Sequence, residues 1–275
     1  MGDTGLFGPG SLIWRVNREN VLLLGGGRAL ILQVAHPLVA AGVAQHSNYR
    51  GDPWGRLYRT LDITSRIIFG STPVAEKAAA HLWRVHGRVH GVSPAGVPYD
   101  ARDPALLMWV HATLVDTALL VYRRYVGPLT IRELRRYYDE ALLLGETFGI
   151  PRQRQPATYA DFNEYFLSMI EGDALVVTDT LRDVVDATLS LGLPRLARPL
   201  VGPLNLATVG MLPTELRTEL GLAWGPARER LLGASQALLR SLLPLLPGLL
   251  REVPPARYAE RQASGRRPPR TSSYA

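Results

Sequence analysis

Three helix-start signals constrain the fold of this chain more than any other feature of its sequence. Asp52, Thr72 and Asp103 each carry a side-chain oxygen, and each stands immediately before a proline. Such an oxygen can accept a bond from a free backbone N–H of the first turn, and proline is tolerated there because its missing N–H has no helical partner. The sequence therefore predicts three helices that begin at these residues.

The first fifty residues also have a helical pattern. Ser11 can cap an apolar helix, which we expect Gly25 to Gly27 to break. Residues 28–45 are apolar nearly all round, which is typical of a central helix, and Pro37 should bend or end it. Glycines, Arg28 and Pro37 interrupt this apolar stretch, so a pair of buried helices is a better interpretation than a membrane span.

Further helix-start signals follow along the chain. Thr130 with Glu133 forms a capping box, and Thr158 can cap another helix. The one plausible β element is the turn-rich stretch 93–100, which could form a small hairpin. We predict an all-α, single-domain fold of about nine to eleven helices over residues 11–263. Residues 1–10 would be a flexible lead-in, and residues 264–275 a disordered basic tail.

Composition excludes several classes of protein. The chain has no cysteine, which excludes disulfides, cysteine-ligated zinc, iron–sulfur clusters and c-type haem. Its net charge is +7, but no run of basic residues alternates with aromatic ones before the tail, so we expect no nucleic-acid partner. The start of the chain has neither an export signal nor an apolar span, and we therefore expect a cytoplasmic location.

The histidines are the candidate chemical groups. His36, His81, His86, His90 and His111 fall in apolar helical surroundings, and His46 falls at a helix end. Any single one could be a neutral ring bonded to a neighbour. Burying several in one half of a chain is costly unless each has a partner or binds a metal. Two pairs of polar residues, four apart in sequence, can each share a helix face and address one pocket: Arg56 with Thr60, and His86 with His90.

Motif patterns narrow the kind of site. The chain has no His-Glu-x-x-His for a zinc protease, no Glu-x-x-His for a di-iron bundle, and no Gly-x-Ser-x-Gly elbow. The three glycines at 25–27 do not follow a parallel-sheet pattern, which argues against a dinucleotide loop. A single axial histidine between apolar, arginine-rich helices would suit haem b.

Several motifs together resemble one family, the mpaB/rubber-oxygenase catalytic domain. The resemblance covers about residues 11–255 and rests on the runs GGRALILQVAHP (26–37), GRLYRT (55–60) and HGRV with Gly91 (86–91), on Gly96 with Tyr99, and on DP with WVH (103–111). It implies a globin-like all-α fold that holds haem b. Characterised members of that family oxidatively cleave carbon–carbon double bonds of polyprenyl chains.

The resemblance also implies roles for individual residues. His86 matches the position of the iron ligand, and His111 is the second candidate, with contact to the haem or the pocket wall as its other role. Arg56 and Thr60 match an arginine and a threonine beside the haem. We therefore expect His86 to bind the metal, and Arg56, Thr60 and His111 to bind the cofactor.

Two departures from the family pattern bear on the reaction. Arg59 stands where the rubber-cleaving members have a distal lysine, and arginine cannot lose its proton to coordinate iron. Arg59 and His36 are the candidate catalytic residues. Arg59 would gate or polarise bound oxygen, and both residues would help to shape the pocket. The acidic residue proposed as a base in rubber cleavage has no clear match. His90 also departs from the pattern, and we favour a solvent-facing position for it over a site role.

Three functions therefore remain open. The first is a haem b-dependent oxygenase that takes dioxygen and an apolar small molecule, with or without an electron donor, for C=C cleavage or hydroxylation. The second is a haem-binding or sensor protein without turnover. The third is a cofactor-free helical scaffold.

Overall fold

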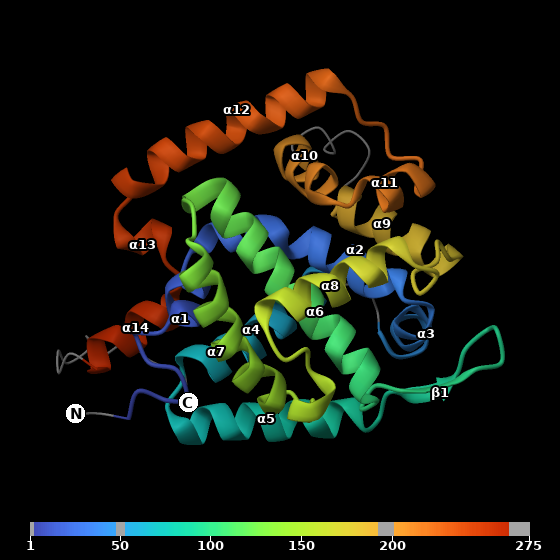
Figure 1. Cartoon of the computed structure of the whole chain (residues 1–275), viewed down its shortest axis with the longest axis horizontal. Helices are drawn as coiled ribbons and strands as arrows, with labels where there is room; N and C mark the ends of the chain where they lie inside the picture. The colour runs from blue at the N-terminus through green and yellow to red at the C-terminus, as the bar shows by residue number, and fades with distance from the viewer. Residues whose placement is uncertain (1–2, 48–52, 192–200, 264–275) are drawn as a thin grey trace.

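The computed structural model describes residues 3–47, 53–191 and 201–263, without the side chains of Pro53, Trp54, Arg56 and Leu57. Within these residues the chain is almost entirely helical (Figure 1). Its α-helices are α1 (Leu12–Asn17), α2 (Gly26–Ala35), α3 (Pro37–His46), α4 (Pro53–Phe69), α5 (Thr72–His86), α6 (Pro104–Val121), α7 (Ile131–Thr147), α8 (Tyr159–Glu171), α9 (Asp179–Ser190), α10 (Gly202–Met211), α11 (Thr214–Glu219), α12 (Pro226–Leu242), α13 (Gly248–Arg251) and α14 (Pro254–Ala263).

Shorter elements complete the fold. The 3₁₀ turns are η1 (Asn20–Gly25), η3 (Arg152–Arg154) and η5 (Leu243–Leu245), and η2 (Tyr122–Val126) is a π-helical end to α6. Strands β1 (His90–Val92) and β2 (Pro98–Asp100) form an antiparallel hairpin in which Gly91 pairs with Tyr99. The all-α prediction and the small hairpin are confirmed. The predicted helix count was too low, because α2 and α3 are separate and the C-terminal region divides into short helices at its prolines.

Most of the predicted helix starts are confirmed by cap hydrogen bonds. The side chains of Ser11 and Asp103 accept bonds from the backbone N–H groups of Trp14 and Ala105, and Thr130 and Thr158 each form a capping box. The prediction for Thr72 was displaced by one residue, because Ser71 precedes the helix and Thr72 is its first residue. The predicted Asp52 cap and the tail 264–275 lie outside the described residues.

Two further predictions need correction. Gly25 to Gly27 do not break the first helix, since α1 already ends at Asn17 and α2 starts at Gly26. His86 and His90 do not share a helix face, because α5 ends at His86 and His90 begins β1. Pro37 does separate two helices: the η1–α2 and α3 segments meet at an angle of 106°.

The core is built around α2 and α6. Helix α6 is buried on most of its circumference, and Trp109 on it stacks on Phe166 of α8 and donates a hydrogen bond to the Leu32 carbonyl. A side chain at Gly25 would meet the Thr117 methyl group at 2.5 Å, and one at Gly27 would meet Thr208 at 2.7 Å. Gly25 at the end of η1 and Gly27 in α2 therefore allow this segment to approach α6 and α10 closely.

A buried ion pair fastens α2 to α6. The Arg28 guanidinium bonds Asp116 Oδ2 at 2.6 Å, the Thr117 hydroxyl at 2.5 Å and the Met211 carbonyl at 2.7 Å. Arg28 is 4% exposed, and burial lowers its pKa while Asp116 opposes this shift. Since the guanidinium donates to three partners, Arg28 has a structural role and is not a free charge.

Helix α6, continued through η2 to Val126, is long and apolar enough to cross a membrane by length and composition. About 72% of its apolar window is buried inside the protein, which is also the pattern of a core helix. At the other extreme, α12 runs along the outer edge of the molecule over α10 and η2 (Figure 1). A smaller apolar cluster, separate from the main core, lies beneath it: Val21, Val121, Tyr125, Ala207, Met211 and Leu243.

Candidate functional site

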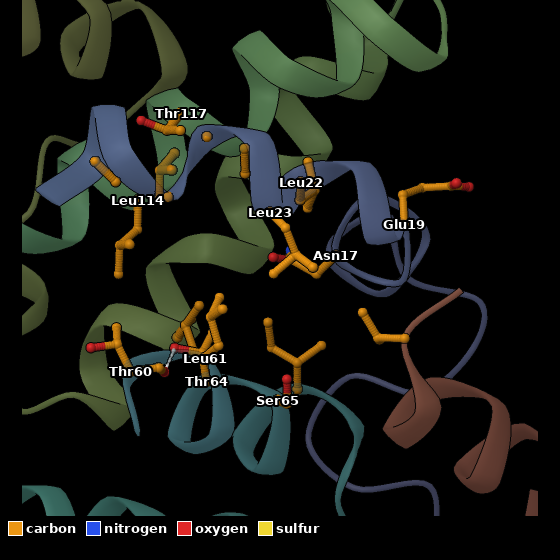
Figure 2. Close-up of a pocket in the computed structure, with 18 of the residues that line it drawn as sticks. Asn17, Glu19, Leu22, Leu23, Thr60, Leu61, Thr64, Ser65, Leu114 and Thr117 are labelled. Atoms are coloured by element: carbon orange, nitrogen blue, oxygen red, sulfur yellow. Dashed lines mark hydrogen bonds between the residues drawn. The ribbon is translucent and has the colours of Figure 1, made fainter. Parts of the chain in front are cut away.

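A cavity of about 160 Å³ lies between α4 and the wall formed by η1, α2 and α6. Thr60, Leu61, Thr64 and Ser65 point from α4 toward Leu22, Leu23 and Leu114 on that wall (Figure 2). The main packing partners of α4 are α5, α14 and α1, so the cavity separates it from the central helices. The lining is mostly aliphatic, with hydroxyl groups on α4 and a few polar side chains opposite.

One end of the cavity is bounded by the C-terminal part of the chain. Val253 lines the cavity beside Glu19, and Val253 N–H donates to the Arg18 carbonyl. Glu19 is 2% exposed and accepts two-pronged hydrogen bonds from Arg251, with Nη2 at 2.8 Å from Oε1 and Nε at 2.9 Å from Oε2. This buried ion pair holds the C-terminal segment against the N-terminal one at the cavity's edge.

His111 of α6 is a buried histidine in the lining of the cavity. Its Nε2 lies 3.0 Å from the Ala141 carbonyl and donates to it, while its buried Nδ1 has no hydrogen-bond partner. Burial lowers the pKa of His111 to about 4, so the ring is neutral at pH 7 and Nδ1 carries a free lone pair. An imidazole fixed at one nitrogen and open at the other is a candidate acceptor or ligand.

His86, like His111, has a ring nitrogen without a hydrogen-bond partner, but it lies outside the lining of the cavity. It is half-buried in the last turn of α5, its buried Nδ1 has no hydrogen-bond partner, and it is not among the residues that line the cavity. Burial, and secondly the charge of Arg102, lower its pKa, so it too is a neutral imidazole at pH 7. Two residues join α5 to α4, so the turn that carries His86 folds back toward the first turns of α4.

The predicted α4 residues have different positions. Thr60 is half-buried and lines the cavity, so the structure brings together two of the predicted residues, Thr60 and His111. Arg59 is on the exposed side of the same turn. Arg56 belongs to α4, but its side chain lies outside the described residues.

The other histidines are separate from the cavity. His36 caps α3, with Nδ1 accepting from the Leu38 N–H at 3.3 Å, and burial lowers its pKa. His46 donates to the His90 carbonyl at 3.1 Å and so connects α3 to the hairpin. His81 and His90 are exposed. In the described part of the chain, no three His, Asp or Glu side chains gather as a metal cluster would require.

Other cavity residues were not singled out as site residues from the sequence. Tyr137 of α7 lines the cavity, accepts a hydrogen bond from Asn17, and has a pKa raised to about 12 by burial. Gln33 reaches the same space from α2. Thr60 and Thr64 are four apart, so the hydroxyl row on α4 was visible in the sequence. Nothing local marked Tyr137, because its position depends on how α7 packs.

Comparison with known proteins identifies relatives. A sequence profile described as "ER-bound oxygenase mpaB/B'/Rubber oxygenase, catalytic domain" matches residues 14–243. The uncharacterized protein Rv2237 of Mycobacterium tuberculosis and the uncharacterized protein Mb2261 of Mycobacterium bovis are each 28% identical over 224 residues, which is 79% of this chain and 87% of theirs. No solved structure matches the chain.

The profile covers most of the chain, including every helix from α2 to α11 and the residues that line the cavity on α2, α4 and α6. The motifs that pointed to this family in the sequence lie within the same span. The chain therefore belongs to the mpaB/rubber-oxygenase catalytic-domain family, a family of oxygenase domains.

Proposed function

We propose that this protein is a haem b-dependent oxygenase that acts on an apolar small molecule. The observation that carries the proposal is the apolar cavity of an oxygenase-family domain with an unpaired, neutral imidazole nitrogen in its wall. The cytoplasmic location expected from the sequence remains a prediction beside it.

The donor groups of the chain suit haem. Without cysteine, the iron must be held by a nitrogen or oxygen ligand, and neutral imidazole is a common axial ligand of haem. His86 and His111 both have a buried Nδ1 without a hydrogen-bond partner, and burial keeps both rings neutral. His86 stays the predicted iron ligand. Thr60, His111 and Arg56 stay the predicted contacts to the cofactor.

The cavity itself suits a small apolar group. Its volume of about 160 Å³ is below the ~300–1,000 Å³ of typical ligand pockets. We assign it to the reacting part of the substrate and to dioxygen. Its aliphatic lining would exclude water from that space, and the hydroxyl group of Thr64 would orient a polar end of the substrate.

A bound haem b would supply the redox chemistry that activates dioxygen. The chain's own part is to hold and orient. His111 Nδ1 can only accept a hydrogen bond at pH 7, because its proton is on Nε2 and is bound to the Ala141 carbonyl. Arg59 and His36 remain the predicted catalytic side chains, although neither of them lines the cavity.

The proposal is tested by producing the protein with a haem precursor and recording its absorption spectrum and its oxygen consumption. We expect an intense Soret band and oxygen uptake that depends on an added apolar alkene. Ala118→Phe, which would fill the cavity from α6, should reduce uptake at least tenfold while the protein remains folded. Ala105→Phe on the exposed side of α6 is the matched control and should keep the activity.

Each other outcome selects a different function. A Soret band without oxygen uptake for any apolar alkene would contradict the oxygenase and support a haem-binding or sensor protein. A colourless protein after haem supplementation would contradict both and leave the helical scaffold. Equal oxygen uptake by Ala118→Phe and Ala105→Phe would show that the reaction does not need the cavity.

A further inference from the structure

The C-terminal helices carry a row of exposed leucines. In α12 only Leu232 is fully buried, although the helix and the turn after it are rich in leucine. We call the exposed row the leucine ridge: Leu231 (59% exposed), Leu238 (60%), Leu242 (44%), Leu245 (78%) and Leu249 (67%). Leu231, Leu238 and Leu242 are spaced 7 and 4 residues apart and so share one face of α12, and Leu245 and Leu249 follow in η5 and α13.

Helix α12 therefore has two apolar sides. Leu232, Leu239 and Leu243 pack inward, beside α10 and η2, whereas the ridge leucines are exposed. Helix α12 itself lies at the edge of the molecule (Figure 1). Leu246 and Leu250, at 38% and 59% exposed, extend the apolar surface through η5 and α13. A group of exposed leucines along neighbouring helices is typical of a docking surface, because burying apolar side chains against a partner removes them from water.

The charge of the residues around the ridge indicates what kind of partner it binds. Residues 226–251 contain four arginines and one glutamate, and one of the arginines, Arg251, is paired with Glu19. Arg228 and Arg230, in the first two turns of α12, donate to the carbonyls of Ala223 and Pro226 rather than to carboxylates. Arg240 donates to the backbone carbonyls of Arg123 and Arg124, so η2, which contains these two further arginines, lies beside α12. The ridge thus lies within a positively charged surface.

A second copy of the chain fits this surface poorly. Two such surfaces placed face to face would bring arginines against arginines, which opposes association. Residues 226–251 also contain no aromatic residue, whereas tyrosine and tryptophan are enriched in the energetic centres of protein interfaces. Leucine beside arginine is instead the pattern of helices that lie in the headgroup layer of a membrane.

We propose that the leucine ridge docks the protein onto the surface of an anionic phospholipid bilayer. The leucines would enter the boundary between headgroups and acyl chains, and the arginines would meet lipid phosphates. The helix would lie along the surface and would not span it. The proposal goes beyond the oxygenase assignment and does not depend on it.

The test is co-sedimentation of the full-length protein with vesicles of phosphatidylcholine alone and of phosphatidylcholine mixed with phosphatidylglycerol. We expect binding to the anionic vesicles, weaker binding to the neutral ones, and a decrease with added salt. Leu238→Gln with Leu249→Gln should lower the bound fraction at least tenfold. The matched control is Leu143→Gln with Leu167→Gln, which changes two exposed leucines on α7 and α8 and should bind like the wild type.

The charge is tested separately. Arg228→Gln with Arg230→Gln should weaken binding to anionic vesicles and reduce its salt dependence, whereas Arg132→Gln with Arg135→Gln on α7 should not. Equal binding by the ridge and control leucine pairs would overturn the proposal. The proposal would also be overturned if the wild-type protein stayed in the supernatant with every kind of vesicle. In that case, a change from dimer to monomer in the ridge variant would identify a second copy of the chain as the partner.

Discussion

Helices α6 and α12 are nearly equal in length and both rich in leucine, yet α6 is mostly buried and α12 is mostly exposed. Helix α6 buries eleven of its residues, among them His111 and Thr117, whereas α12 buries one. The polar groups of α6 have buried partners, such as Arg28 and the Ala141 carbonyl, and the apolar groups of α12 face water. Apolar content alone therefore does not tell which helix is the core, and the site lies on the one where polar groups are buried.

The largest expected effect of this difference is on stability. Trp109→Ala in α6 should lower the free energy of unfolding by about 4 kcal/mol, since a fully buried indole stacked on Phe166 leaves a cavity and an unpaired Leu32 carbonyl. Urea denaturation measures the change. Trp83→Ala, at a tryptophan that is 42% exposed, should lower it by about 1 kcal/mol or less, and equal losses would contradict the core assignment of α6.

The sequence was sufficient for the fold class because helix caps are local. Ser11, Asp103, Thr130 and Thr158 interact with residues two or three positions away, and each interaction was predictable. The burial of α6 and the exposure of the ridge were not predictable, because they depend on which helices pack on them. The same holds for the cavity, which joins Thr60 to His111 across fifty residues of chain, and for His90, which a turn at Gly87 moves into a strand.

Next in size is the buried ion pair between α2 and α6. Arg28→Met should destabilise the protein by about 3 kcal/mol, because it leaves the Asp116 carboxylate and the Met211 carbonyl without their partner. The exposed pair Arg66–Asp62 on α4 has the same chemistry and a distance of 2.9 Å. Arg66→Met should cost about 0.5 kcal/mol or less. A loss at Arg28 no larger than that at Arg66 would show that the pair does not fasten the two helices.

Within α12, two adjacent leucines give a sharper comparison. Leu232 is 1% exposed and Leu231 is 59% exposed. Leu232→Ala should lower the free energy of unfolding by about 2–3 kcal/mol, and Leu231→Ala by less than about 0.5 kcal/mol. Thermal and urea unfolding of both variants measure the difference. If Leu231→Ala were equally destabilising, the outer row would be part of the core rather than a ridge.

The smallest expected effect is on the pH dependence of the free energy of unfolding. Burial lowers the pKa of His111 in the folded protein to about 4, so the neutral ring contributes stability above pH 6.5 that is lost as the pH falls toward 4. Between pH 7 and pH 5 the free energy of unfolding of the wild type should fall by roughly 2 kcal/mol more than that of His111→Gln. Unfolding free energies at both pH values give the comparison. Parallel pH profiles for the two proteins would contradict the buried, neutral state of His111.

The most direct test of the central assignment is a haem titration of the apoprotein, followed at the Soret band, for the wild type, His86→Gly and His111→Ala. The account predicts a band in the wild type, its loss in His86→Gly with recovery on adding free imidazole, and a shifted or weaker band in His111→Ala. Circular dichroism checks that each variant is folded. A full band in His86→Gly, with loss in His111→Ala, would contradict the assigned iron ligand and place the iron on the cavity wall of α6.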